Sequence, residues 1–370
     1  MEKDLFGAFP GYSIIQRYLL EVSRKDFPAE HSVQQKNRIT EQNLFDKSSF
    51  LRYIRSQTIC SCAIIQTKDY LSMKKIYFVF AVVLFCVFPL KAAEKNTKSL
   101  SFVADDIQPV RIWENHPVPF AVPEDSGRKE ILIRPKSKTR RISQISDPEI
   151  YPFIVPGGKP RPAVIIAPGG GYSYVAWEPV IKVGRWLQKN GFNAFILKYR
   201  CPGRRDAALT DMARAIRLVR YRAKEFNVDP QRVGVIGFSA GGHLCASVSA
   251  FSGEPYPATD EADKLKYRPD FAALIYPAYL VKDVKNLTLA GNFKVDKTTP
   301  PTFLVQTADD PIKVENALAW HLALLRAGVS CEMHIWDKGG HGYGISKTNN
   351  PVSDWPETGL KWFRRVTRKK

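Results

Sequence analysis

The 370-residue sequence lacks the signatures of several common protein classes. Its six cysteines do not have metal-ligand spacing: Cys60 and Cys62 are one residue apart, and no set of His or Cys partners follows them. No glycine-rich loop continues as Gly-Lys-Ser/Thr, and none opens a helix as G-x-G-x-x-G. Internal repeats and low-complexity tracts are absent as well. These absences argue against a metal site, a nucleotide-phosphate site and a repeat architecture.

Acidic residues are few relative to basic ones. The chain has 55 Lys and Arg against 36 Asp and Glu, which gives a formal net charge of +19 at pH 7. A positive net charge of this size is compatible with binding to nucleic acid, to an anionic surface or to an acidic polymer. The basic residues are scattered, however, and no nucleic-acid motif accompanies them, so we expect a solvated basic surface and no nucleic-acid partner. Even the Lys/Arg cluster from Arg128 to Arg141 is interpreted as solvated. The sequence does not indicate an oligomeric state.

The chain has no apolar run of the ~20 residues that a membrane span needs. A basic stretch beginning at Met73 precedes the shorter apolar run Ile76–Leu90, which Pro89 closes, and small residues follow it. This pattern is typical of a secretory signal peptide, with a membrane anchor as the less favoured alternative. We therefore expect residues 73–93 to be a signal peptide and residues 1–72 to be a non-native upstream extension. The mature protein is expected to be secreted or periplasmic, without a stable membrane span.

From residue 146 onward, short apolar strands alternate with amphipathic helices. The expected strands are Ile150–Val155, Ala163–Ile166, Ala194–Leu197, Val233–Ile236, Phe271–Tyr276, Thr302–Gln306 and Cys331–Trp336. The expected helices are Pro179–Lys189, Leu209–Phe226, Gly242–Ala250, Glu315–Ala327 and Asp354–Val366. This alternation predicts an α/β fold with a doubly wound, mostly parallel sheet and helices on both faces, whose site lies at the carboxyl ends of the strands.

The domain therefore extends over residues 146–370, and a polar segment, residues 94–145, leads into it. A short strand is expected at Ile131–Ile133 within that segment. Removal of a signal peptide would leave three cysteines, Cys201, Cys245 and Cys331. Two of them lie in elements that we expect to be buried, so no disulfide framework is expected despite export.

A sharp turn joins one of the expected strands to the next helix. In Gly237-Phe238-Ser239-Ala240-Gly241, the serine stands on a tight turn, and the glycines remove side chains that would collide there. The backbone N–H of Ala240 then points to where a substrate oxyanion would form. A plain strand-to-helix turn is the alternative, but G-x-S-x-G between a strand and a helix is typical of a nucleophilic serine.

Two further loops follow expected strands in the order that a serine nucleophile needs. A carboxylate in Thr307–Pro311 can orient an imidazole, although such a sequence alone is more often a turn or a helix cap. His341 stands among glycines and is free to approach Ser239. We assign Asp309 as the acid, because it comes first after the strand, where the loop can still face the histidine. Asp310 precedes Pro311, which biases Asp310 to an extended conformation and is expected to point its side chain elsewhere. The order Ser239, Asp309, His341 predicts a serine–acid–histidine triad.

The remaining histidines fit a catalytic site less well. His243 lies on the expected helix one turn past the serine and is interpreted as structural, while His321 and His334 lie within a helix and a strand. A third glycine loop, Pro168–Tyr172, follows the strand Ala163–Ile166 and can aim backbone N–H groups at a substrate carbonyl.

Together these segments resemble the α/β-hydrolase family, in particular bacterial acetyl-xylan-esterase-like and other short-acyl carbohydrate esterases. The resembling segments are Ala167–Tyr172, Leu197–Arg200, Asp211–Arg220, Gly237–Leu244, Thr307–Pro311 with Val314–Asn316, and Gly339–Gly344. The resemblance extends from about Arg111 to the C-terminus. It implies a serine esterase without cofactor or metal, with an oxyanion hole made by Gly170, Gly171 and Ala240. Candidate substrate contacts are Tyr172, Glu178 and Tyr199. The segment between Tyr276 and Pro300, which normally carries part of the pocket wall in this family, is short beside many relatives.

We therefore expect an exported serine esterase that removes short acyl groups, acetyl above all, from polysaccharides or oligosaccharides. Three alternatives stay open. A prolyl-peptidase-like exopeptidase shares the Thr-Ala-Asp-Asp sequence but normally has a large gating domain, and a lipase normally has a long apolar lid. The third alternative is a catalytically inactive binding protein on the same fold.

Overall fold

The computed structural model describes residues 107–114, 116–133, 140–291 and 293–369. The expected upstream extension, residues 1–72, and the expected signal peptide, residues 73–93, lie outside the described residues, as does the beginning of the polar segment 94–145. No helix in the described part of the chain is long and apolar enough to cross a membrane. The described cysteines are free thiols.

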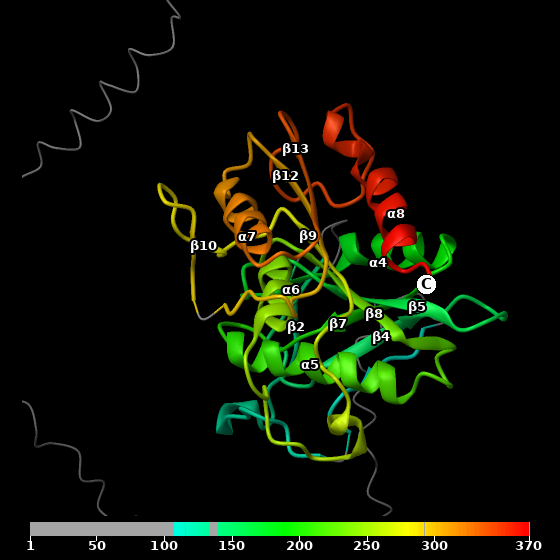
Figure 1. Cartoon of the computed structure of the whole chain (residues 1–370). Coiled ribbons are helices and arrows are strands. Elements are labelled where there is room, and N and C mark those ends of the chain that lie inside the picture. The colour runs from blue at the N-terminus through cyan, green and yellow to red at the C-terminus, as the bar shows by residue number, and fades with distance from the viewer. Residues whose placement is uncertain (1–106, 115, 134–139, 292, 370) are drawn as a thin grey trace, which may run out of the picture. The chain divides into compact units, whose positions relative to one another are not determined.

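An eight-stranded sheet forms the centre of the fold, in the order β1-β4-β7-β5-β8-β9-β12-β13 (Figure 1). Its strands are β1 (Val110–Arg111), β4 (Glu149–Phe153), β5 (Arg161–Ala167), β7 (Asn193–Lys198), β8 (Val228–Phe238), β9 (Ala272–Ile275), β12 (Thr302–Thr307) and β13 (Cys331–Trp336). The strands from β7 to β13 in this order are parallel, while β4 is antiparallel to both β7 and β1. The doubly wound, mostly parallel sheet predicted from the sequence is thereby confirmed.

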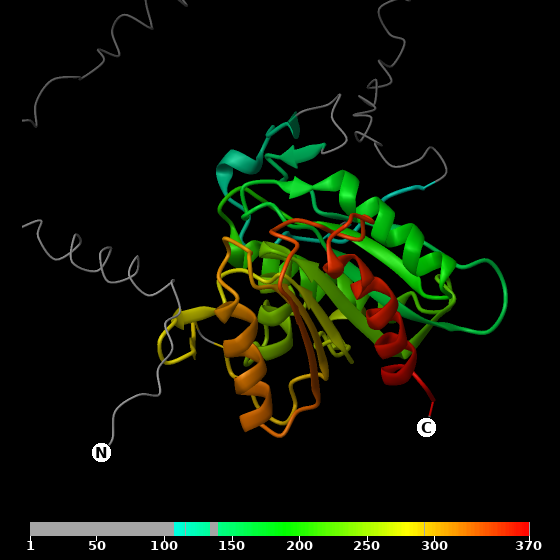
Figure 2. The ribbon, with the colours of Figure 1, turned by 90° about the horizontal axis from the view of Figure 1, so that it is seen from above.

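Helices cover both faces of this sheet (Figure 2). They are α4 (Trp177–Lys189), α5 (Arg205–Tyr221), α6 (Ala240–Ala250), α7 (Glu315–Arg326) and α8 (Trp355–Val366). Helices α4 and α8 lie on the same face, where the rings of Trp186 and Trp355 meet edge to face with centroids 5.9 Å apart. Helices α5, α6 and α7 lie on the other face. In α4, Val180, Val183 and Leu187 are buried because steps of three and four residues place them on one side of a helix.

Two smaller sheets and three short 3-10 helices complete the described elements. One small sheet has the order β2-β3-β6 and consists of β2 (Ile131–Ile133), β3 (Arg141–Ser143) and β6 (Val175–Ala176). The other is the hairpin of β10 (Val281–Asp283) and β11 (Thr288–Leu289). The 3-10 helices are η2 (Pro123–Asp125), η3 (Glu261–Lys264) and η4 (Pro351–Asp354). β6 runs directly into α4 and follows the glycine loop after β5, so the first small sheet lies next to this loop.

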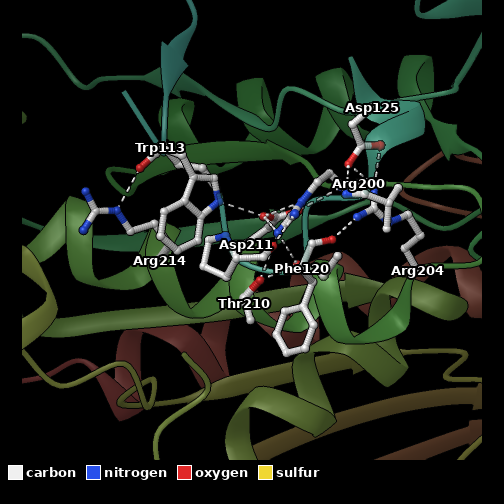
Figure 3. A network of polar contacts seen from close by, with 12 residues as sticks. Trp113, Phe120, Asp125, Arg200, Arg204, Thr210, Asp211 and Arg214 are labelled. Carbon is white, nitrogen blue, oxygen red and sulfur yellow. Dashed lines mark hydrogen bonds and ion pairs between the residues drawn. The ribbon is translucent and has the colours of Figure 1, made fainter. Parts of the chain in front are cut away.

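A buried polar network attaches the segment before β4 to α5 (Figure 3). Arg200, just after β7, forms an ion pair of 2.7 Å with Asp211 of α5, and neither side chain is exposed to solvent. The indole N–H of Trp113 donates to Asp211 Oδ1 at 2.9 Å, and Arg214 Nε donates to the carbonyl of Ile112 at 2.8 Å. Ile112 and Trp113 are therefore part of the core, which the polar composition of the segment 94–145 did not indicate.

The same network fixes the loop between β7 and α5 (Figure 3). Arg204 binds both carboxylate oxygens of Asp125 at 2.6 Å and also donates to the carbonyl of Phe120. The Arg200 guanidinium donates to the carbonyl of Pro119 at 2.6 Å. Charge-assisted bonds of this kind are stronger than neutral ones, so this loop is held from two sides.

Candidate active site

Ser239 stands at the junction of β8 and α6 in a rare backbone conformation, with φ 55° and ψ −118°. Its N–H donates to the carbonyl of Ile275 at 3.0 Å, which ties the turn to β9. A Cβ atom on Gly237 would lie 2.1 Å from the carbonyl oxygen of Gly241, and a Cβ on Gly241 would lie 2.1 Å from that of Ala167. Both positions therefore accept only glycine. This explains the G-x-S-x-G pattern by the close approach of three backbone segments.

His341 lies between Ser239 and a carboxylate. Its Nε2 is 2.9 Å from Ser239 Oγ, and its Nδ1 is 2.8 Å from Asp310 Oδ2. The imidazole is 25% exposed, while the Asp310 side chain is fully buried. The ring also meets that of Tyr276 edge to face, with centroids 4.8 Å apart. The histidine is thus held on two sides with one nitrogen toward the serine hydroxyl, which is the geometry of a base next to a nucleophile.

The structure brings together Ser239 and His341 as the sequence predicted, but the carboxylate at the histidine is that of Asp310 and not that of Asp309. The prediction of Asp309 as the acid was wrong. The Asp310 side chain is buried, and it is held there by the N–H of Ile312, which donates to Oδ1 at 2.7 Å, and by the imidazole at Oδ2. Asp309 is exposed to solvent.

Asp309 instead fastens the histidine loop. Its carboxylate accepts hydrogen bonds from the N–H groups of Gly340 at 2.8 Å and Gly339 at 3.3 Å. These N–H groups, above all that of Gly340, lower the pKa of Asp309 because they stabilise its charged form. Thr307 Oγ1 donates to the carbonyl of Gly340 at 2.8 Å. The loop before His341 is therefore attached at two points to the end of β12.

The glycine loop after β5 lies against the serine turn. A Cβ atom on Gly169 would be 2.9 Å from the carbonyl oxygen of Phe238. Gly170 has a φ of +136°, and a Cβ there would be 1.9 Å from the carbonyl oxygen of Tyr174, so only glycine fits. Within the described residues, the N–H groups of Gly170 and Gly171 donate no hydrogen bond to the protein.

The predicted oxyanion-hole residues are thus placed near the serine. Gly170 and Gly171 line the same cleft as Ser239. Ala240 is the first residue of α6, where backbone N–H groups have no partner within the helix. The positive end of the helix dipole adds to this local preference for negative charge. The arrangement can stabilise an oxyanion that forms beside Ser239 Oγ.

The three predicted substrate contacts do not line the cleft, in contrast to the prediction. Tyr172 is buried, and its hydroxyl is 2.8 Å from Nδ1 of His243. Burial and, secondarily, the positive charge of Arg205 lower the pKa of His243 to about 4, so this imidazole is neutral at pH 7. The tyrosine and the histidine support each other behind the glycine loop, which agrees with a structural interpretation of His243.

Tyr199 and Glu178 have structural partners as well. The Tyr199 hydroxyl is fully buried and donates to the carbonyl of Pro168 at 2.8 Å, so it supports the glycine loop from below. Glu178 accepts a hydrogen bond of 2.7 Å from Arg140 Nε. These contacts join residues far apart in sequence, and no local pattern indicates them.

The cleft at Ser239 has a volume of about 550 Å³. Its apolar lining, called the α4 wall below, comes from α4 and the end of β8 and consists of Pro179, Val180, Val183 and Phe238. Arg141, Tyr174 and Tyr279 are among its polar lining residues. Sequence reasoning missed the α4 wall, Tyr279 and Arg141, and Arg141 had been included in a cluster interpreted as solvated. Among the described residues, no group of His, Cys, Asp and Glu could hold a metal ion.

Comparison with known proteins gives related enzymes. The BD-FAE family model matches residues 154–266. The acetylxylan esterase of Xylanibacter ruminicola is 32% identical over 208 residues, which cover 50% of this chain and 41% of that protein. Endo-1,4-beta-xylanase B of Butyrivibrio fibrisolvens is 26% identical over 222 residues, which cover 54% of this chain and 35% of that protein. The chain thus spans less than half the length of these curated relatives.

A solved structure is similar over nearly its whole length. It is the crystal structure of an acetyl ester-xyloside bifunctional hydrolase from Caldicellulosiruptor lactoaceticus, with 33% identity and a TM-score of 0.58. The match covers 70% of this chain and 96% of that chain.

Proposed function

The chain belongs to the α/β-hydrolase family of carboxylic ester hydrolases, and from this premise we propose that it removes short acyl groups, acetyl above all, from polysaccharides or oligosaccharides. The observation that carries the proposal is the alignment of Ser239 Oγ, the His341 imidazole and the Asp310 carboxylate, with contacts of 2.9 Å and 2.8 Å. The backbone N–H groups next to the serine support it. The names of the related acetylxylan esterase and acetyl ester-xyloside hydrolase support the choice of substrate class.

The proposed reaction uses these groups in two stages. Ser239 Oγ attacks the ester carbonyl carbon while His341 Nε2 accepts the hydroxyl proton. The buried Asp310 carboxylate holds Nδ1–H and stabilises the imidazolium that forms. The N–H groups of Gly170, Gly171 and Ala240 stabilise the tetrahedral oxyanion, often the largest single contribution to such catalysis.

The second half of the reaction reverses the proton transfers. His341 gives its proton to the departing sugar oxygen, and the carbonyl re-forms as an acyl ester of Ser239. A water molecule then attacks this ester while His341 accepts a proton from it. His341 passes this proton to Ser239 Oγ as the acyl–oxygen bond breaks, which releases the carboxylic acid and restores the serine hydroxyl. The apolar wall of α4 lies beside Ser239 and suits the acyl group, whereas the polar side of the cleft suits the sugar.

The proposed substrate class is tested by acetate release from acetylated xylan, acetylated pectin and acetylated mannan, with 4-nitrophenyl octanoate and an aminoacyl-proline anilide as comparison substrates. We expect acetate release from at least one polysaccharide and none by Ser239→Ala. Preference for the octanoate would favour a lipase, and preference for the anilide would favour an exopeptidase. No hydrolysis of any substrate by a folded protein would favour an inactive binding protein.

We further propose that the enzyme is exported, with a natural start at Met73 and cleavage near Ala93. The support is the basic, apolar and small-residue pattern of residues 73–93. N-terminal sequencing of the protein from its native host tests this. A mature chain that still contains Phe6 or Leu51 would refute it.

A further inference from the structure

Arg141 is a cation in the active-site cleft, and no acidic residue that the structure describes is paired with it. It lies at the start of β3 and lines the cleft together with Ser239. Its guanidinium stacks on the ring of Tyr174, 4.4 Å from the ring centroid. Within the described residues, no carboxylate forms an ion pair with it, whereas the adjacent Arg140 is paired with Glu178. The two neighbouring arginines thus differ: Arg140 is paired with Glu178, whereas Arg141 has no carboxylate partner in the part of the chain that the structure describes.

The surroundings of Arg141 leave its charge uncompensated. Within the described part of the chain, the lining of the cleft contains no Asp or Glu. A second guanidinium, that of Arg205, lies 4.6 Å from the ring centroid of Tyr279, which also lines the cleft. Arg205 has no carboxylate partner among the described residues either. Among the described lining side chains, an anion that enters the cleft therefore meets the cation of Arg141 and no carboxylate, and Arg205 stands behind Tyr279 as a second positive charge.

Stacking on a tyrosine orients Arg141 without consuming its hydrogen-bonding capacity. A ring contact occupies the face of the guanidinium, and the N–H groups around its edge stay available as donors. This planar edge matches the two oxygens of a carboxylate, which it can bind in bidentate fashion. A purely structural arginine in this position would be expected to use these donors on the protein, as Arg200 and Arg214 do.

We propose that Arg141 determines specificity by binding a carboxylate of the substrate, so that the preferred ester is an acylated saccharide that also carries an acidic sugar. The inference rests on the proposed function, because the same cleft must hold the scissile ester at Ser239. A uronate is the carboxylate-bearing sugar of this substrate class. The cleft of about 550 Å³ leaves room for a sugar unit beside a short acyl group.

The test uses two acetate esters that differ in one negative charge, 4-acetoxybenzoate and its methyl ester. The measured quantity is the ratio of kcat/KM for the charged ester to kcat/KM for the neutral one. Arg141→Gln should lower this ratio about five- to tenfold, since it removes one partly exposed ion pair. Arg141→Lys, which keeps the charge without the planar edge, should lower it less. In the wild type the ratio should fall as salt rises, because ions screen the attraction.

A matched control is Arg185→Gln on α4. This guanidinium also lies over an aromatic ring, that of Phe153 at 6.0 Å, but it does not line the cleft. The control should leave the ratio at the wild-type value. For acetylated xylooligosaccharides with and without a uronic acid branch, Arg141→Gln should likewise lower the ratio of kcat/KM for the charged substrate to that for the neutral one, and Arg185→Gln should not.

The outcomes separate the two proposals. If the neutral ester is cleaved and Ser239→Ala abolishes this, but both Arg141 variants keep the wild-type ratio within about twofold, the role of Arg141 is refuted and the esterase stands. If Arg185→Gln changes the ratio as much as Arg141→Gln, a general surface field and not a binding residue is responsible, which also refutes it. Failure of the folded wild type to cleave either ester refutes the proposed function, and the role of Arg141 with it.

Discussion

The Oδ2 atom of Asp310 lies 2.8 Å from Nδ1 of His341, on the side of the imidazole opposite Ser239. The other carboxylate oxygen, Oδ1, accepts a hydrogen bond of 2.7 Å from the N–H of Ile312. Both oxygens therefore have a donor, and the side chain is shielded from solvent. A buried carboxylate fixed in this way can set the tautomer of the histidine, because only Nδ1–H can donate to it.

Asp310→Asn should lower kcat for 4-nitrophenyl acetate by about 10⁴, the loss that follows when a triad acid is replaced by its amide. The amide no longer requires a proton on Nδ1, so the histidine is less often in the tautomer that can accept the serine proton. Steady-state kinetics of the folded variant check this. A loss of less than about tenfold would show that Asp310 is not the acid.

Asp309→Asn is the matched control in the adjacent position. An amide oxygen can still accept from Gly339 and Gly340, so we expect a loss of about tenfold at most in kcat. Asp309→Ala should be worse than Asp309→Asn, since it removes both contacts to the histidine loop. A greater loss in Asp309→Asn than in Asp310→Asn would reverse the assignment.

Gly170→Ala should lower kcat by about 10² to 10³, the range found when one oxyanion donor is lost. The added Cβ would lie 1.9 Å from the carbonyl oxygen of Tyr174, so the loop must shift and move its N–H groups. Gly203→Ala is a control for the positive φ alone, because Gly203 has a φ of +68° with nothing within 4 Å of the added atom. If both variants lose activity equally, the effect is one of backbone strain, and Gly170 has no special place.

His243 should make stability depend on pH. Its pKa is about 4 in the folded protein, against about 6.5 in an unfolded chain, so between these values the unfolded chain binds the extra proton. The free energy of unfolding should therefore fall as pH drops from about 6.5 toward 4, by at most about 1.4 kcal/mol per pH unit from this group. Above about pH 6.5, the imidazole is neutral in both states and contributes no slope.

Urea unfolding at about pH 5 and about pH 7 measures this slope, and His243→Gln should reduce it. Burial also lowers the pKa of His321, so the His243→Gln variant keeps a residual slope in the same direction. Identical slopes for the wild type and His243→Gln would contradict a depressed pKa at His243.

The specificity constant should fall steeply as the acyl chain grows beyond about four carbons, because each methylene that the pocket cannot accommodate costs about tenfold or more. The wall is made of the buried Val180 and Val183 together with Phe238. A 4-nitrophenyl ester series from acetate to decanoate measures the preference, and Val183→Ala should move it toward longer chains. A wild-type maximum at octanoate or beyond would favour a lipase.

Local patterns in the sequence predicted the strands, the helices, Ser239 and His341. Apolar runs and amphipathic spacing indicate strands and helices, and the glycines around Ser239 and His341 indicate tight loops, because each of these features depends only on residues close together in the chain. The choice between Asp309 and Asp310 depends on how a two-residue turn orients each side chain, which the sequence does not specify. The structural role of Tyr199 could not be predicted, because its hydrogen bond to Pro168 joins segments that follow two different strands and no local sequence pattern indicates it.

The central claim is that Ser239 is the nucleophile of an esterase, and the most direct measurement is the turnover of 4-nitrophenyl acetate by Ser239→Ala. The substitution removes Oγ and leaves a fold-compatible side chain on the turn, so the variant should fold and have the thermal midpoint of the wild type within a few degrees. We predict a fall of about 10⁶ in kcat, as for the loss of a nucleophile in a comparable triad. Turnover near that of the wild type would contradict the assignment of Ser239 and, with it, the proposed mechanism.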